Sequence, residues 1–178
     1  MDIKFAILGF VSWKPCSGYD LKKIFADSVF IPWSGSNNQI YRTLMDLHRE
    51  ELVTNEVQYQ ENYPPRKVYT ITEKGLSELR NWVLSSPEAP QLINSFLIQL
   101  AWADQLEQEE LDELLDKYEY EVNMQLIMGQ ERIRRENVNP ARTPREEYLW
   151  NMICQNWVTS YENELSWIRK LRQELEGR

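Results

Sequence analysis

A run of hydrogen-bonding side chains stands at the start of a predicted helix in the first half of the chain. The residues are Ser36, Asn37, Asn38, Gln39, Tyr41 and Arg42. Asn and Gln can each form two hydrogen bonds with adenine, and Arg can do so with guanine. The first turn of a helix also offers free backbone N–H groups to a phosphate. This pattern indicates a surface that reads nucleic acid, but on its own it is equally typical of a loop and a helix cap.

A basic segment with strand character follows this helix. Residues 53–59 and 68–71 alternate with period two and predict two strands, and residues 62–65 between them predict a turn with two prolines. Arg66 and Lys67 directly follow the turn, where a β-ribbon could carry them to a DNA backbone or minor groove. Further candidates for phosphate contacts are Lys22, Lys23, Arg49 and Lys74. Each of these charges, taken alone, is more simply explained as a solvated surface group.

Helices must position both segments. Apolar spacing predicts a first helix over residues 2–12, and Ser17 is a candidate N-cap for a second helix that runs to about residue 27. The third helix is predicted to begin near residues 34–36 and to turn one apolar stripe inward. That stripe consists of Ile40, Leu44 and Leu47. A fourth helix opens at residues 72–75. Three helices, a ribbon and a closing helix form the layout of a winged helix-turn-helix.

Three segments resemble the PadR family of transcriptional regulators. They are AILGFVSWKPCSGYDLKKIF at residues 6–25, WSGSNNQIYRTLMDLHREELV at residues 33–53 and RKVYTITEKGLSEL at residues 66–79. The helical tail, which contains ELSWI at residues 164–168, is similar to the longer C-terminal domain of the phenolic-acid-responsive branch. Two positions depart from the family pattern. Arg42 stands where the family often has Pro, and Glu51 stands where it usually has Gly before the first strand.

The resemblance implies a homodimeric repressor. Its N-terminal winged helices would bind a pseudo-palindromic operator in double-stranded DNA, and its C-terminal helices would dimerise. In some family members a small, often aromatic, ligand releases the DNA. Dimerisation also follows from physical reasoning, because one recognition helix reads only a few base pairs and useful specificity needs two half-sites.

Charge divides the chain at a linker. The formal net charge is −8, yet residues 1–85 hold ten Lys/Arg and ten Asp/Glu, so the whole excess lies in residues 86–178. The segment 85–90, Ser-Ser-Pro-Glu-Ala-Pro, coincides with this boundary. We therefore expect a winged helix DNA-binding domain over residues 1–85 and a helical dimerisation and effector domain over residues 86–178. Because binding depends on local potential, the first domain can meet DNA within an acidic protein.

The second half is predicted to be nearly all helix and is rich in aromatic residues. Aromatic rings stack on planar ligands, and helix interfaces are common pocket sites. The candidate ligand-binding residues are Phe96, Trp102, Trp157 and Tyr161, and the candidate carboxylate partners are Arg132, Arg134 and Arg135. An aromatic residue at helical spacing more often belongs to a core or a dimer interface, so this alternative stays open.

Several function classes lack their motifs. The chain has no phosphate-binding Gly loop, no zinc spacing and no nucleophile elbow, and its only histidine is His48. Two distant cysteines, Cys16 and Cys154, are expected to be free thiols. We expect no enzyme, no metal and no cofactor. Without an 18-residue apolar run or a signal-peptide pattern, we expect a cytoplasmic protein with no membrane partner. The alternative function is a winged helix that binds protein rather than DNA, which the acidic tail keeps open.

Overall fold

The computed structural model describes residues 3–28, 37–60, 63–90, 94–135 and 142–176, and these form two compact units, Met1–Glu88 and Ala89–Arg178. The division falls inside the segment 85–90. The fold is mainly helical with a small antiparallel sheet, as the sequence predicts. Within the part of the chain that is described, no helix is both long and apolar enough to cross a bilayer.

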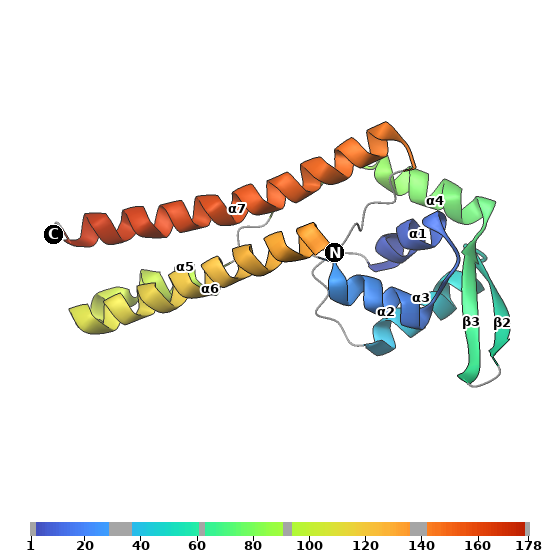
Figure 1. The fold of residues 1–178 in the computed structure, drawn as a ribbon, viewed down its shortest axis with the longest axis horizontal. Coiled ribbons are helices and arrows are strands. Elements are labelled where there is room, and N and C mark those ends of the chain that lie inside the picture. The colour runs from blue at the N-terminus through green and yellow to red at the C-terminus, as the bar shows by residue number, and fades with distance from the viewer. Residues whose placement is uncertain (1–2, 29–36, 61–62, 91–93, 136–141, 177–178) are drawn as a thin grey trace. The chain divides into compact units, whose positions relative to one another are not determined.

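The described residues of the N-terminal unit form four helices and three strands (Figure 1). In chain order they are α1 (Ile3–Trp13), β1 (Cys16–Ser17), α2 (Gly18–Asp27), α3 (Asn37–Arg49), β2 (Val53–Gln60), β3 (Tyr63–Ile71) and α4 (Glu73–Val83). The sheet order is β1-β3-β2, with antiparallel pairs. One core joins the helices to the base of the sheet, and it includes Ile7, Leu8, Leu21, Leu44 and Val53. The predicted winged helix-turn-helix is confirmed.

Ser17 both begins α2 and belongs to the sheet. Its hydroxyl accepts a hydrogen bond from the Asp20 backbone N–H at 3.2 Å, and the Asp20 carboxylate accepts one from the Ser17 backbone N–H at 2.9 Å. This reciprocal capping box confirms Ser17 as the N-cap. Ser17 also pairs with Val68 of β3, so β1 adds a third strand to the ribbon that the sequence predicts with only two.

The prediction of a turn over residues 62–65 is wrong for both prolines. Pro64 and Pro65 lie in β3, whose backbone pairs with β2 from Tyr63 onward. The ladder shifts register between Gln58 and Gln60, opposite these prolines. A bulge leaves backbone groups unpaired, so it is a place in a strand where residues without an N–H are tolerated.

The C-terminal unit is helical. It contains α5 (Ser95–Ala101), the short 3-10 helix η1 (Ala103–Gln105), α6 (Gln108–Arg135) and α7 (Pro144–Glu176). Figure 1 shows the long helices α6 and α7 side by side. They run antiparallel, because Asp116 of α6 pairs with Arg172 of α7, whereas Gly129 of α6 packs on Trp157. Two small buried clusters join the helices: Phe96, Leu115 and Ile168 form one, and Val122, Leu126 and Leu165 form the other.

Candidate nucleic-acid interface and ligand pocket

Helix α3 presents two different faces. Ile40, Leu44 and Leu47 are at most 1% exposed, which confirms the predicted inward stripe. The opposite face carries exposed side chains that include Asn38, Gln39, Arg42 and Met45. Of the other predicted base-reading residues, Ser36 lies outside the described residues, and Asn37 begins α3 but its side chain is not described. The helix can therefore anchor in its own core while it offers hydrogen-bonding groups outward.

Tyr41 combines exposure with a packing role. Its side chain is 47% exposed, but its ring lies so close to Gly18 that a methyl group on Gly18 would overlap it. Gly18 is the first residue of α2. Tyr41 thus contacts the start of α2 across the helix-turn-helix and helps to set the position of α3.

The two basic residues of β3 are exposed but differently engaged. Arg66 donates from Nε and Nη2 to the side-chain oxygen of Gln58 on β2, at 3.2 and 3.1 Å. Its Nη1 lies 4.0 Å from the Asp20 carboxylate of α2. Burial alone would raise the pKa of Asp20, but the hydrogen bonds from Ser17, together with the Arg66 charge, lower it overall. Lys67 has no ion pair with a residue that the structure describes. Arg66 is therefore held in place, and Lys67 is available to an anion.

The remaining predicted phosphate contacts divide into two groups. Lys22 and Lys23 are exposed on α2, and the Lys23 ammonium lies 5.7 Å from the centre of the Tyr19 ring. Arg49 instead donates to Asp46 at 2.7 Å, and Lys74 donates to the Glu50 carbonyl oxygen at 2.8 Å. Arg49 and Lys74 thus have partners within the unit, whereas the two α2 lysines form no ion pair with a described residue.

One residue in the turn that joins α3 to the sheet has a backbone conformation that normally favours glycine. Glu51 has φ 61°, the only positive φ among the described non-glycine residues. Its carbonyl oxygen accepts a hydrogen bond from the Thr72 hydroxyl at 2.8 Å, and its carboxylate lies 3.4 Å from the Lys74 ammonium. Glu51 therefore adopts the left-handed conformation instead of avoiding it, and contacts to the start of α4 hold it there.

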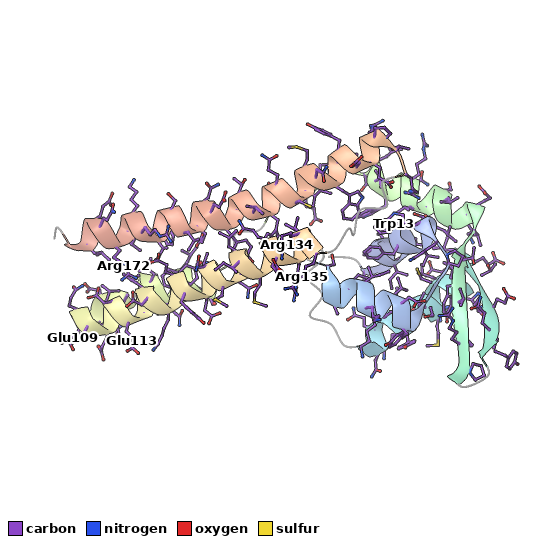
Figure 2. All side chains as sticks on the ribbon, viewed as in Figure 1. Trp13, Glu109, Glu113, Arg134, Arg135 and Arg172 are labelled. Atoms are coloured by element: carbon purple, nitrogen blue, oxygen red, sulfur yellow. The ribbon has the colours of Figure 1, made fainter. Side chains whose placement is uncertain are left out.

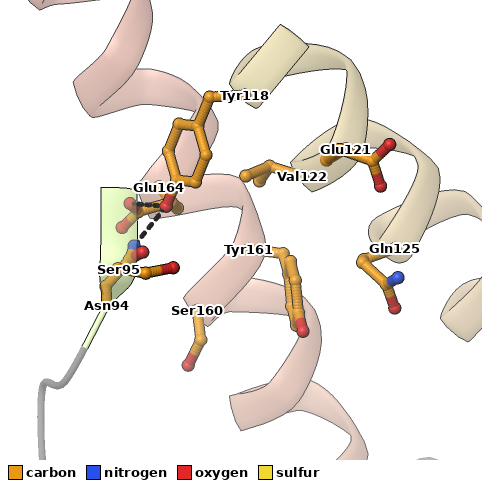
Figure 3. A pocket seen from close by; sticks show the side chains of 9 residues that line it. All are labelled: Asn94, Ser95, Tyr118, Glu121, Val122, Gln125, Ser160, Tyr161 and Glu164. Atoms are coloured by element: carbon orange, nitrogen blue, oxygen red, sulfur yellow. Dashed lines mark hydrogen bonds between the residues drawn. The ribbon is translucent and has the colours of Figure 1, made fainter. Parts of the chain in front are cut away.

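An open pocket of about 520 Å³, referred to below as the cavity, lies within the C-terminal unit (Figure 3). The residues that line it come from α5 and the residue before it, from the middle of α6 and from α7. They are Asn94, Ser95, Tyr118, Glu121, Val122, Gln125, Ser160, Tyr161 and Glu164. The Tyr118 hydroxyl donates to Glu164 Oε1 at 2.5 Å and accepts a hydrogen bond from Asn94 Nδ2 at 2.5 Å. Burial, followed by the hydrogen bond to Glu164, raises the pKa of Tyr118 to about 12.

The predicted ligand residues do not gather in one place. Tyr161 lines the cavity. Phe96 is 3% exposed and stacks on Tyr118 with ring centres 3.6 Å apart, so it belongs to the core. Trp157 packs over Gly129, and Trp102 is 69% exposed. Only Tyr161 of the four therefore lines the cavity. Phe96 instead packs against Tyr118, which is one of the lining residues.

The predicted carboxylate partners lie elsewhere on α6. Arg134 and Arg135, at the end of α6 opposite Glu109 and Glu113 (Figure 2), both pair with Glu131. These two hydrogen bonds lower the pKa of Glu131 to about 2. Neither arginine lines the cavity, and Arg132 does not line it either.

Sequence reasoning missed Asn94, Tyr118 and Glu164. Tyr118 stands in an apolar helical stripe and Glu164 in an acidic tail, so neither stands out by type or spacing. They meet only through the antiparallel register of α6 and α7. Among the described residues no three His, Cys, Asp or Glu side chains gather as a metal site would require.

Comparisons with known proteins agree with both units. Residues 7–81 match the model of the Transcriptional regulator PadR-like family, and residues 94–176 match the Virulence activator alpha C-term model. The negative transcriptional regulator PadR of Bacillus subtilis is 29% identical over 113 residues, 63% of this chain but only 62% of that relative. The match thus spans less than two thirds of the relative's length.

Two solved structures show the same fold over nearly the whole chain. The crystal structure of Bacillus subtilis PadR in complex with operator DNA has a TM-score of 0.81 and 23% identity, and covers 95% of this chain and 96% of that one. Its complex with p-coumaric acid has a TM-score of 0.79 and 22% identity, and covers 98% of each chain.

Proposed function

We propose that this chain is a homodimeric repressor of transcription, because it belongs to the PadR-like family of DNA-binding transcriptional regulators. The members of this family are not enzymes. Its N-terminal unit would bind one half of a pseudo-palindromic operator, and its C-terminal unit would dimerise and bind a small aromatic effector that releases the DNA. One observation carries the proposal: α3 buries its apolar stripe and exposes Asn38, Gln39 and Arg42, in the same unit as the basic wing residues Arg66 and Lys67.

The exposed residues divide into two roles. Asn38 and Gln39 stand in the first turn of α3, where a recognition helix contacts base edges in the major groove. Arg66, Lys67 and the α2 lysines would contact phosphates, which fix the position of the protein but carry no sequence information. Replacing Asn38 or Gln39 with Ala should relax sequence preference, whereas Lys67→Ala should weaken binding to all DNA alike.

The proposal is tested by selection of bound sites from random DNA, followed by gel shifts on the selected site. If a dimer neutralises about six to ten phosphates, affinity falls by roughly three to five decades between about 50 and 200 mM salt. An affinity for DNA that does not change with salt concentration would contradict the proposed phosphate contacts. Absence of DNA binding at low salt would instead favour the rival function, a winged helix that binds a protein partner.

Support for the homodimer comes from apolar side chains that the C-terminal unit leaves exposed. On α7 they form a stripe with helical spacing: Tyr148, Leu149, Met152 and Ile153. On α5 and α6 they include Leu97, Ile98, Ile127 and Met128. Apolar groups gathered in this way mark a surface that a partner covers. Sedimentation analysis over a range of protein concentrations measures whether that partner is a second copy.

Support for an effector comes from the cavity of the C-terminal unit. Its volume of about 520 Å³ lies within the range of small-molecule sites. The similar Bacillus subtilis PadR has been crystallised with p-coumaric acid, an aromatic carboxylate. An effector of this chain should release the selected DNA in a gel shift at concentrations that saturate direct binding to the protein.

A further inference from the structure

The cavity of the C-terminal unit has an acidic lining. Two of its nine lining residues, Glu121 and Glu164, carry carboxylates, and none is Lys, Arg or His. The other polar groups are the hydroxyls of serine and tyrosine and the amides of Asn94 and Gln125. Neither carboxylate forms an ion pair with any residue that the structure describes. A ligand that enters this cavity therefore meets negative charge without a neutralising partner.

One of these carboxylates is held in a defined orientation. Tyr118 is fixed on one side by its stacking on Phe96, with ring centres 3.6 Å apart and planes 5° from parallel. On the other side its hydroxyl donates to Glu164 Oε1 at 2.5 Å (Figure 3). A tyrosine in this position acts as a donor, so Glu164 serves as the acceptor. Its second oxygen remains available for a donor from a ligand.

An aromatic surface lies beside the carboxylates. The Tyr161 ring is half-buried on the cavity wall, and its neighbour Trp157 holds it at a centre-to-centre distance of 4.5 Å. Val122, which is 6% exposed, adds apolar wall from α6. The face of a tyrosine ring attracts cations, and its area stacks on planar rings.

We propose that this cavity binds small aromatic molecules that carry a protonated amine and discriminates against aromatic carboxylates. The ammonium group pairs with Glu164, the exposed Glu121 adds negative charge at the edge of the cavity, and the ring of the ligand packs against Tyr161 and Val122. This assignment deepens the proposed effector function and rests on it only for the consequence that binding has for DNA. It also predicts a ligand preference unlike that of the similar protein crystallised with p-coumaric acid, since a carboxylate placed here would be repelled by the Glu164 carboxylate.

The test is a pair of ligands that differ mainly in charge. Tyramine and 3-(4-hydroxyphenyl)propionate share a phenol ring and a short alkyl chain, and one ends in an ammonium and the other in a carboxylate. Calorimetric titration of the full chain should show saturable binding of tyramine and, for the acid, an affinity lower by roughly tenfold or more. Equal binding of both ligands, or tighter binding of the acid, overturns the proposal, and so does the absence of tyramine binding.

Variants locate the site. Glu164→Gln keeps an oxygen that accepts from Tyr118 but removes the charge, and it should weaken tyramine binding by roughly tenfold. Glu162→Gln is the matched control, because Glu162 is exposed on α7, does not line the cavity and gives the same change in net charge. Tyr161→Leu should weaken tyramine binding as well. Circular dichroism melting shows that each variant is folded; equal effects of Glu164→Gln and Glu162→Gln overturn the site.

The two proposals fail separately. Gel shifts without any ligand test DNA binding and do not depend on the cavity. If the protein binds the selected DNA tightly but does not bind tyramine, the proposed regulator function is supported and the proposed amine site is contradicted. If the protein binds tyramine through Glu164 but binds no DNA, the proposed amine site is supported and the proposed regulator function is contradicted.

Discussion

Glu51 shows how one residue can keep a conformation that its side chain disfavours. Its φ of 61° brings Cβ close to the following carbonyl, a strain of about 1–2 kcal/mol for a residue other than glycine. Hydrogen bonds from Thr72 to the Glu51 carbonyl and from Lys74 to the Glu50 carbonyl stabilise the turn through backbone groups. Because these acceptors are backbone atoms, they survive a change of side chain.

Glu51→Gly should therefore stabilise the N-terminal unit. The relief of strain exceeds the entropic disadvantage of glycine, and we expect a gain of about 0.5–1 kcal/mol in the free energy of unfolding. Denaturant titration followed by circular dichroism measures it. Glu51→Ala is the control, since it removes the same carboxylate but keeps Cβ and should bring no gain. Similar stability of the Gly and Ala variants would contradict the strain.

Tyr118 gives the C-terminal unit a dependence on alkaline pH. Its pKa is raised to about 12 by burial first and by the hydrogen bond to Glu164 second. Because the folded value lies above the ordinary value of 10.0, the stabilisation from the neutral phenol is complete below about pH 10 and is lost as the pH rises through about 12.

Tyr118→Phe should remove this dependence and the two hydrogen bonds, and should lower the free energy of unfolding by about 1 kcal/mol at neutral pH. Phenolate absorbance should lose a step that titrates near pH 12. Tyr120→Phe serves as the control for stability, because Tyr120 is 61% exposed and two residues along the same helix. An equal loss of stability in both variants would show that the hydrogen bonds of Tyr118 contribute nothing.

At the scale of elements, the helices were predictable from local patterns. Ser17 followed by Asp20 is a capping signal that needs no tertiary partner, and the stripe Ile40, Leu44 and Leu47 fixes the buried face of α3. The strand β1 was not predictable, because two residues form a strand only where β3 supplies the pairing partner. The turn predicted at Pro64 and Pro65 was wrong for a similar reason, because the bulge that accommodates these prolines depends on the register of β2.

The cavity was less predictable than the interface on α3. Asn38 and Gln39 lie next to each other in one exposed turn, so their residue types and spacing are enough to make them candidates. Tyr118 and Glu164 are 46 residues apart, and only the pairing of α6 with α7 joins them. The sequence made Tyr161 a candidate ligand residue, and Tyr161 lines the cavity, but composition gave no information on the sign of the charge beside it.

Two glycines in the N-terminal unit should respond in opposite ways to substitution by alanine, because only Gly18 lies in the contact between α2 and α3. Gly18→Ala should destabilise the N-terminal unit by about 1–3 kcal/mol, because the new methyl group overlaps the Tyr41 ring. Gly9→Ala lies inside α1, and beyond the neighbouring helix backbone no described atom comes within 4 Å of the added methyl group, so the change should be neutral or stabilising by up to about 1 kcal/mol. Thermal melting compares the two variants.

Removal of the Tyr41 ring tests the cause. In a Tyr41→Ala background, Gly18→Ala should lose most of its effect, because the two changes share one contact. If the cost of Gly18→Ala is unchanged without the ring, the overlap is not its source. Gel shifts on the same variants then show whether Tyr41 acts on DNA binding through the position of α3.

At the scale of the whole molecule, charge separates two tasks. The sequence up to residue 85 is neutral overall, and the excess of eight negative charges lies beyond it. A neutral unit with exposed basic groups can bind phosphates, whereas an acidic unit disfavours contact with DNA. This distribution suits a protein whose second unit pairs with another copy, since two half-sites are then read by one dimer.

The exposed stripe on α7 provides the decisive prediction for that dimer. Leu149→Glu combined with Ile153→Glu places two charges on one face of α7, where an apolar partner surface would have to desolvate them. The double variant should sediment as a monomer at concentrations where the native chain is a dimer. Asn151→Asp, at an exposed polar position of α7 outside this stripe, should leave the dimer intact. Each monomer of the double variant keeps its own α3 and wing, so it should still bind a single half-site weakly. Its affinity for the full operator should fall by about two to four decades, because the two half-sites are no longer linked. A double variant that remains dimeric and binds the operator at full affinity would place the dimer contact away from this stripe.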